Sequence, residues 1–341
     1  MTDHTGAETA KSRLPLIAIT VELLLAVLVW IWPEHAFRAV SFAVWGLVEV
    51  SPLVIPGIFL AAWIVSSGAD SRIAGAFRRR TLHAVIAASL IGAITPVCGV
   101  TVLPLMAGLL AAGVPLAPIM AFWLSSPVTD PAMLATTAAT LGTSFALGKT
   151  LAAFGMGAFG GLATAAFANR DWSLDALRDN RLATQLSKDS CGCAKTFNWR
   201  IWNDPVRIDR FRKQLFATTR LIVICLLPAF TMEYVLNTAL TPGSLTGFMG
   251  KDNWWSIPAA VFVGAPAYID GYAALPLTRG LIDQGMSQGA ALAFLVSGGV
   301  VSIWGALAIF PVLKLKPFVL FLSLALAGSL LAGYIFEWVM R

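Results

Sequence analysis

The sequence is short of charge and rich in apolar residues. Only 12% of its 341 residues are Asp, Glu, Lys or Arg, whereas 57% are hydrophobic. A soluble globular domain carries about 25% charged residues, so half of that share cannot cover a surface that faces water. The mean hydropathy of +0.77 agrees. These values argue against a soluble enzyme, a nucleic-acid reader and a disordered scaffold, and they indicate a protein embedded in a lipid bilayer.

Several chemical motifs are also missing. The sequence has no Gly-x-x-x-x-Gly-Lys-Ser/Thr phosphate loop and no His-Glu-x-x-His metal site, and its three histidines lie far apart. Its four cysteines are too few for a disulfide scaffold. We therefore expect no enzyme and no resident cofactor. The net charge of +6 does not indicate nucleic-acid binding, because the basic residues lie between apolar runs, as the positive-inside rule expects of cytoplasmic loops.

Apolar runs of the length that a membrane helix needs, about 20 residues, recur along the chain. They cover residues 16–32, 39–65, 82–112, 114–141, 145–168, 216–240, 254–283, 286–312 and 317–339. We expect the first run to be a retained helix, since no small-residue cleavage site follows it. Two hydrophilic stretches, 66–81 and 169–215, separate groups of these apolar runs. The arginine-rich stretch 66–81 is predicted to be cytoplasmic.

Two neighbouring runs contain helix-breaking residues at their centres. Thr95-Pro96-Val97-Cys98-Gly99 interrupts the run 82–112, and Ser125-Ser126-Pro127-Val128-Thr129-Asp130-Pro131 interrupts the run 114–141. At membrane depth such breaks are tolerated only where the freed backbone groups face protein or a water-filled cavity. Adjacent broken helices are typical of a transport site.

The second half of the chain repeats the first at a constant shift in residue number. We call this shift the repeat offset; it superposes residue 275 on residue 103. Residues 103–126 and 275–298 are then identical at nine of 24 positions without a gap. We therefore expect four parts: an N-terminal segment with the first membrane helix (1–38), membrane repeat 1 (39–168), a hydrophilic loop (169–215) and membrane repeat 2 (216–341).

The relative direction of the two repeats stays open at this stage. If every run crosses the membrane once, the repeats are parallel and the loop 169–215 lies outside. If one broken segment per repeat is re-entrant or splits into extra crossings, the repeats are inverted and that loop is cytoplasmic. We favour inverted repeats: an all-α polytopic membrane protein whose broken or re-entrant helices meet at a midplane site.

Few charged residues lie inside the apolar runs. Between residues 81 and 169 the only Lys, Arg, Asp or Glu residues are Asp130 and Lys149. We expect Lys149, near a predicted helix end, to snorkel to the interface. An intramembrane carboxylate such as Asp130 usually serves function, although an Asp before Pro131 is also a good N-cap.

A second intramembrane acid, Asp270, is the partner of Cys98 at the repeat offset. A thiol and a carboxylate brought together suit a soft, electrophilic or cationic substrate; the alternative is backbone capping by the acid beside an inert buried cysteine. The substrate-binding candidates are Thr95, Cys98, Thr101, Ser125, Ser126, Asp130, Tyr268, Asp270 and Tyr272. The proton- or ion-coupling candidates are Asp270, Asp130, Glu49 and Glu233, of which the last two could equally pair with a neighbour or lie at an interface.

The loop motif Cys191-Gly192-Cys193 places two thiols one residue apart. Soft metals and metalloids select thiolates, so Cys191 and Cys193 are metal-site candidates. Two sulfurs do not complete a tetrahedral zinc site. The alternative is an incidental pair or a redox-labile disulfide.

The two break motifs, with Pro104-Leu105, Gly108, Gly113 and Phe122-Trp123-Leu124 around them, carry a family resemblance. The chain resembles the ArsP-type predicted permeases, which include organoarsenical efflux permeases. The resemblance implies export of trivalent, thiol-reactive organoarsenicals driven by an ion gradient, with Cys98 as the substrate-contacting thiol. Val100 stands where that family has a second cysteine, and Asp130 where many members have Asn.

The residues and the resemblance together predict a proton-coupled secondary permease of the bacterial inner membrane. Its partners would be a small-molecule substrate and the lipid bilayer, and not nucleic acid. A homo-oligomer and a thiol-mediated metal or metalloid donor at the Cys191/Cys193 loop stay open. The alternatives are a permease for another small solute, such as an anion or an amphipathic organic molecule, and a membrane metal-delivery subunit acting through that loop.

Overall fold

The structure, a computed structural model, is helical throughout the part of the chain that it describes. That part comprises residues 33–68, 81–95, 102–111, 113–178, 198–239, 255–265, 274–301, 306, 309–310 and 312–341. The helices are α2 (Pro33–Ser67), α4 (Thr81–Ile94), α5 (Leu103–Ala111), α6 (Leu116–Ser125), α7 (Pro131–Leu141), α8 (Thr143–Ala165), α9 (Asp171–Leu174), the 3-10 turn η1 (Ile201–Asn203), α11 (Pro205–Ala239), α13 (Ser256–Gly264), α14 (Ala274–Asp283), α15 (Gln288–Val300) and α17 (Leu315–Met340). The expected all-α class agrees with this architecture.

Two described helices, α8 and α17, are long and apolar enough to cross a membrane. A third span is formed by α2 if its two arms, Phe37–Glu49 and Val54–Ser67, count together, because they meet at a bend of 57°. Pro52 and Pro56 lie inside α2. Each removes a backbone donor and pushes against the preceding turn, which accounts for the bend.

The predicted break at residues 125–131 is confirmed, whereas the break expected at Thr95-Pro96-Val97-Cys98-Gly99 falls mostly outside the described residues. The run 82–112 forms α4 and α5, the run 114–141 forms α6 and α7, and the run 254–283 forms α13 and α14. The run 286–312 was expected to be one span, but α15 ends at Val300. The described membrane core therefore contains many half-length apolar helices beside the two long ones.

Helix α11 begins at Pro205, inside the stretch expected to be a hydrophilic loop. The side chain of Asp204 accepts a hydrogen bond from the Val206 amide at 2.9 Å. An acidic residue that caps the first turn, followed by proline at the first helical position, is a strong helix start. This local signal outweighs the weak apolar periodicity of the residues that follow.

The bounds of the helices recur at the repeat offset seen in the sequence. That offset superposes both ends of α11, Pro205 and Ala239, on the two ends of α2, Pro33 and Ser67. The turns after α5 and α14 also match. Gly113 has φ of 82° and Gly285 has φ of 105°. The next residues, Val114 and Met286, donate at 2.9 Å to the carbonyls of Leu109 and Leu281, as in a Schellman helix end.

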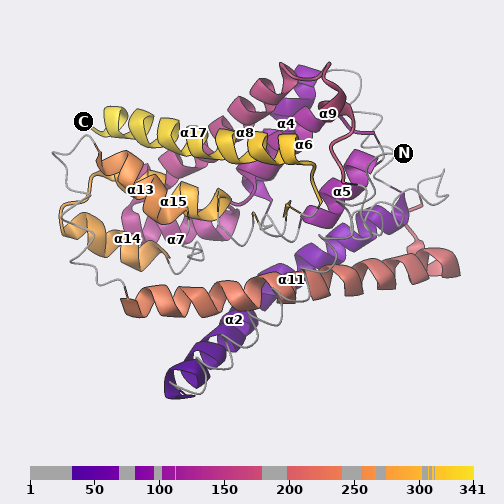
Figure 1. Cartoon of the computed structure of the whole chain (residues 1–341), viewed down its shortest axis with the longest axis horizontal. Helices are drawn as coiled ribbons and strands as arrows, with labels where there is room; N and C mark the ends of the chain where they lie inside the picture. Colours follow the sequence, from indigo (N-terminus) through magenta and orange to yellow (C-terminus); the bar gives the residue numbers. More distant parts are fainter. Residues whose placement is uncertain are drawn as a thin grey trace, which may run out of the picture.

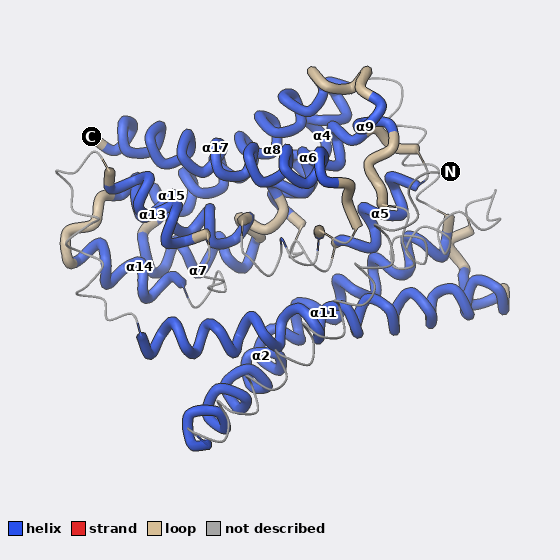
Figure 2. Tube along the Cα trace, viewed as in Figure 1, coloured by secondary structure: helices blue, strands red, loops and turns tan. Residues whose placement is uncertain are grey.

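Helices α4, α6 and α8 pack together, and so do α13, α15 and α17 (Figure 2). Glycines allow the close approach in both groups. A Cβ on Gly161 would lie 2.7 Å from the Ala121 Cβ, and a Cβ on Gly333 would lie 2.8 Å from the Ala293 Cβ. The repeat offset superposes these two contacts. One buried apolar cluster, which includes Trp123 and Phe321, joins the two groups.

Helices α8 and α17 run antiparallel across the junction of the two groups. The Phe145 and Phe336 rings lie 5.3 Å apart, and a Cβ on Gly328 would lie 3.2 Å from the Met156 side chain. Helices α2 and α11 cross each other beside this bundle (Figure 1). Their antiparallel contact includes the rings of Phe59 and Phe211, 5.8 Å apart.

Candidate functional site

The structure places only part of the predicted site. Ser125, Ser126 and Asp130 lie in or beside the break between α6 and α7, and Thr95 follows the last turn of α4. Glu49 is exposed where α2 bends, and Glu233 lies on α11. The remaining candidates lie outside the described residues: Cys98, Thr101, Cys191, Cys193, Tyr268, Asp270, Tyr272 and the side chain of Glu233.

The hydroxyl of Ser125 is used within its own helix. Its Oγ lies 3.0 Å from the Ala121 carbonyl oxygen and 3.1 Å from that of Phe122. A Cβ on Gly92 would lie 2.1 Å from this Oγ, so glycine is required for α4 to approach α6 here. The same arrangement recurs in the second half, where a Cβ on Gly264 would lie 2.5 Å from the Ser297 Oγ. Ser125 therefore serves helix packing.

Asp130 caps helix α7. Its Oδ1 accepts hydrogen bonds from the Ala132 amide at 2.8 Å and from the Met133 amide at 2.9 Å, and Pro131 occupies the first helical position. The residue is only 8% exposed. A carboxylate in this position satisfies two backbone donors and opposes the positive end of the helix dipole. The capping role read from the sequence is therefore present, while a role for Asp130 in proton coupling stays a prediction.

Lys149 is buried, and the expectation that it snorkels to the interface is wrong. The residue is 2% exposed, and its Nζ lies 3.0 Å from the Sδ of Met133. Helix α8 begins at Thr143, so Lys149 lies in its second turn, where α8 packs against α7. The ammonium thus points to the first turn of α7, which Asp130 caps.

Two buried hydroxyl groups, one in the break and one on α7, lack a hydrogen-bond partner in the described part of the chain. They are the Oγ of Ser126, in the break, and the Oγ1 of Thr137, one turn after Met133 on α7. Sequence reasoning missed Thr137 and the burial of Lys149. The spacing of Met133 and Thr137, at positions i and i+4 of one helix, was the available signal for a shared face.

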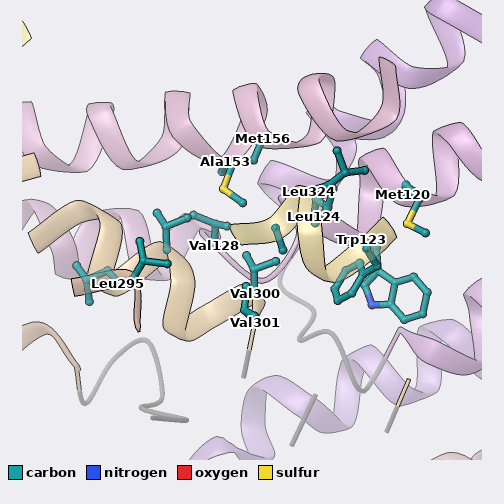
Figure 3. Packing of buried hydrophobic residues seen from close by; sticks show 14 of the residues in the cluster. Met120, Trp123, Leu124, Val128, Ala153, Met156, Leu295, Val300, Val301 and Leu324 are labelled. Atoms are coloured by element: carbon teal, nitrogen blue, oxygen red, sulfur yellow. The ribbon is translucent and has the colours of Figure 1, made fainter. Parts of the chain in front are cut away.

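The break also touches the second half of the chain. A Cβ on Gly299, near the end of α15, would lie 2.8 Å from the carbonyl oxygen of Pro127. Val128 packs in the same apolar cluster as Val300 and Val301, with Met156 of α8 beside it (Figure 3). The polar break is therefore enclosed by apolar side chains from both halves.

A second buried polar group lies between α2 and α11. Arg207 Nη1 donates to the Ser67 carbonyl at 2.9 Å, and its Nε donates to Asp204 Oδ2 at 3.2 Å. The side-chain amide of Gln214 and the hydroxyl of Thr218 are fully buried, and neither has a hydrogen-bond partner among the residues described.

In the whole described part of the chain, no group of three or more His, Cys, Asp or Glu side chains is placed to hold a metal ion.

An apolar groove with a cavity volume of about 670 Å³ lies between α8 and α17. Its lining includes Gly148, Gly155 and Gly328, together with larger aliphatic and aromatic side chains. A polar solute would lose its hydration there without gaining hydrogen bonds. The polar break after α6 is thus the better candidate site.

A family model matches the chain along most of its length, and two curated relatives match shorter stretches of it. Over residues 35–338 it matches a family described as "Predicted permease". It is 24% identical over 142 residues to the UPF0718 protein MJ0584 of Methanocaldococcus jannaschii, which is 42% of this chain and 39% of that protein. It is 29% identical over 101 residues to the UPF0718 protein YcgR of Bacillus subtilis, which is 30% of this chain and 34% of that protein.

The matched stretches thus span little more than a third of either relative's length. No solved structure matches the chain. The resemblance read from the break motifs agrees with the family match, which covers well over half of the sequence and indicates a transporter rather than an enzyme. The chain therefore belongs to the predicted permease family.

Proposed function

We propose that the protein is a secondary-active permease of the bacterial inner membrane whose solute site lies at the break between α6 and α7. The observation that carries this proposal is the group of buried polar side chains, Asp130, Lys149 and Thr137, inside an apolar helical core. Ionisable residues at membrane depth are costly and usually line a substrate or ion pathway. Broken helices near the centre of a transporter are where such sites are built.

An inverted repeat is part of the proposal. Pro127 contacts Gly299, and Met156 contacts Gly328. Each pair consists of two residues that the repeat offset superposes, and in a two-fold arrangement only residues near the axis touch their own equivalents. Because the equivalent helices α8 and α17 are antiparallel, such an axis would lie in the membrane plane. These contacts support inverted repeats that meet at a midplane site.

The proposed substrate is a small thiol-reactive metalloid species, such as a trivalent organoarsenical, exported against protons. This part rests on the family resemblance and on Cys98, with Asp270, Tyr268 and Tyr272 from the equivalent break of the second half. A thiol supplies the soft ligand that such a species prefers. As the arsenic–sulfur bond forms, an arsenic–oxygen bond of the solute breaks; the carboxylate of Asp270 would take the thiol proton and pass it to the leaving hydroxide, which departs as water.

The test uses an arsenical-sensitive bacterial strain that expresses the wild type, Cys98→Ala, Asp270→Asn or the double variant Cys191→Ala/Cys193→Ala. Resistance to trivalent methyl- and phenylarsenicals, arsenite and antimonite is measured, and uptake into everted vesicles is followed with and without a proton gradient. We expect wild-type resistance that is lost in Cys98→Ala and Asp270→Asn.

Three other outcomes of this assay would contradict the proposed substrate or favour another function. The absence of resistance with a well-expressed protein would overturn the arsenical assignment. Loss of function only in the Cys191/Cys193 variant would favour metal delivery through the loop. A harmless Cys98→Ala with a damaging Asp270→Asn would favour a different small solute, and the burial of Lys149 is the observation that makes an anionic solute the second candidate.

A further inference from the structure

We propose that the start of α11 and the turn before it bind the headgroups of anionic membrane phospholipids. The surface consists of Trp199, Arg200, Trp202 and Arg212, and we call it the basic-aromatic surface. The inference requires a chain embedded in a membrane but no particular solute, so it goes beyond the proposed permease function.

This part of the chain carries an excess of positive charge. Residues 198–220 contain six Arg or Lys residues but only two Asp. Both acids are already paired within the chain. Asp204 Oδ2 accepts a hydrogen bond from Arg207 Nε at 3.2 Å, and Asp209 Oδ2 lies 2.6 Å from Lys213 Nζ. The remaining cations therefore outnumber the acids that could neutralise them.

Two of these remaining cations, Arg200 and Arg212, are exposed. Neither has an acidic partner within the described residues. Each lies beside an indole ring. The Arg200 guanidinium lies 5.2 Å from the centroid of the Trp199 ring. The Trp202 ring lies 5.7 Å from that of Phe211, the residue before Arg212. The basic and aromatic side chains thus form one surface, which is complementary to a negatively charged partner.

The two indole rings favour a lipid over a water-soluble anion. Trp199 is 62% exposed and Trp202 is 63% exposed. Tryptophan is enriched at membrane–water interfaces, where its ring lies at the level of the headgroups. In water both rings would stay hydrated, whereas the headgroup region shelters their apolar part and leaves the indole N–H wet. Exposed tryptophan beside unpaired arginine is therefore the pattern expected of a surface at a bilayer.

The position along α11 agrees with headgroup depth. Helix α11 continues from this surface into the apolar run 216–240, which has the length of a membrane span. Arg212 precedes that run by four residues, which is about 6 Å along a helix. The polar layer of a bilayer extends for about this distance beyond the hydrocarbon core.

The end of α2 holds this surface in place and indicates its side of the membrane. Trp63 Nε1 donates to the Trp199 carbonyl at 3.3 Å, and the Asn198 amide donates to the Ser67 carbonyl at 3.0 Å. The arginine-rich stretch 66–81, predicted to be cytoplasmic, begins at this end of α2. We therefore expect the surface to bind lipids of the cytoplasmic leaflet.

The experiment measures which lipids the purified full chain retains. Immobilised protein is equilibrated with detergent micelles that contain equal amounts of phosphatidylglycerol, which is anionic, and phosphatidylcholine, which is zwitterionic. After washing, the retained lipids are extracted and quantified by mass spectrometry. Arg200→Gln/Arg212→Gln removes both charges, and Arg200→Lys/Arg212→Lys keeps them. The matched control, Lys316→Gln/Arg341→Gln, removes two exposed charges at the ends of α17.

We expect the wild type and the matched control to retain phosphatidylglycerol in preference to phosphatidylcholine. Each neutralised arginine should weaken this preference by about fivefold, the usual contribution of one basic residue near an anionic membrane surface. The Lys variant should keep most of the preference. Since the substituted side chains are exposed, all variants should unfold at the temperature of the wild type. Raising the NaCl concentration should also weaken the preference of the wild type, which tests the charge dependence without any substitution.

The inference is overturned if the wild type retains both lipids equally or if Arg200→Gln/Arg212→Gln keeps the full preference. An equal loss in the matched control would mean general electrostatics and would overturn it as well. Glycerol 1-phosphate, which carries the charge without acyl chains, should not displace the lipid at the same concentration; displacement would mean a site for soluble anions. Arsenical export enters none of these outcomes, so failure of this inference and failure of the proposed function are distinguishable.

Discussion

At the residue scale, two buried ionisable side chains of opposite charge, Asp130 and Lys149, contact the first turn of α7. Asp130 accepts two amide hydrogen bonds from the start of α7, while Lys149 contacts the Met133 side chain of that turn. A cap explains why Asp130 is tolerated at membrane depth without any function. The ammonium of Lys149 lies near the start of α8, where the helix dipole disfavours a positive charge.

Substitutions at Asp130 separate its capping role from a coupling role. Asp130→Ala removes the acceptor and should lower the free energy of unfolding by about 1 kcal/mol. Asp130→Asn keeps a capping oxygen and should keep most of the stability, but it cannot carry a proton. Thermal unfolding in detergent and vesicle transport, measured on the same preparations, check both effects.

For Asp130→Asn, stability with undiminished transport would show that the carboxylate acts only as a cap. Loss of transport at normal stability would support coupling. A stability loss in Asp130→Asn as large as in Asp130→Ala would contradict the capping geometry.

At the scale of the helices, small residues decide where the half-length helices pack. Helix α8 approaches α4 and α6 through Gly157 and Gly161, and α17 approaches α13 and α15 through Gly333. Hydrocarbon around a membrane protein offers no hydrophobic driving force between helices, so association depends on close packing of this kind. These contacts hold α6, the helix that precedes the break at residues 125–131, against α8.

Alanine substitutions at glycines test this packing. A Cβ on Gly161 would lie 2.5 Å from the Val85 Cγ1, so Gly161→Ala should be destabilising by about 1–3 kcal/mol through overpacking. Gly155→Ala is the matched control on the same helix, because a Cβ there meets nothing within 4 Å. It should be neutral or slightly stabilising, since alanine favours a helix. Apparent melting temperatures in detergent distinguish the two; equal effects would contradict the packing described for α8.

At the scale of the whole molecule, the repeat offset links sequence, helix bounds and contacts between the halves. The turns at Gly113 and Gly285 match in the sign of φ and in hydrogen bonding. The antiparallel course of α8 and α17 is what favours the inverted topology. A parallel duplication would place equivalent helices in the same direction through the membrane.

Cysteine labelling tests the inverted arrangement. Ser144 and Lys316 are exposed, lie near the starts of α8 and α17, and are equivalent at the repeat offset. In a variant whose four native cysteines are replaced by alanine, Ser144→Cys and Lys316→Cys should face opposite sides of the membrane. A membrane-impermeant maleimide should then label one of them in intact cells and the other only after permeabilisation. Labelling of both from the same side would rule out inverted repeats.

The amino-acid sequence by itself determined the helical membrane class, the break at residues 125–131, and the offset between the two halves. These features follow from composition, from backbone chemistry and from local order, and none depends on distant contacts. Asp204 and Pro205 also carry a sequence signal for the start of α11. The helix was not predicted, because the residues that follow have a weak apolar periodicity.

Only the tertiary structure decided which residues the breaks meet and which polar side chains are buried. Lys149 lies near a helix start in the sequence, and its burial depends on α7 folding back over α8. The contacts of Pro127 with Gly299 and of Met156 with Gly328 join positions far apart in the chain. Such contacts arise from the packing of whole helices, which the periodicity of any one helix does not specify.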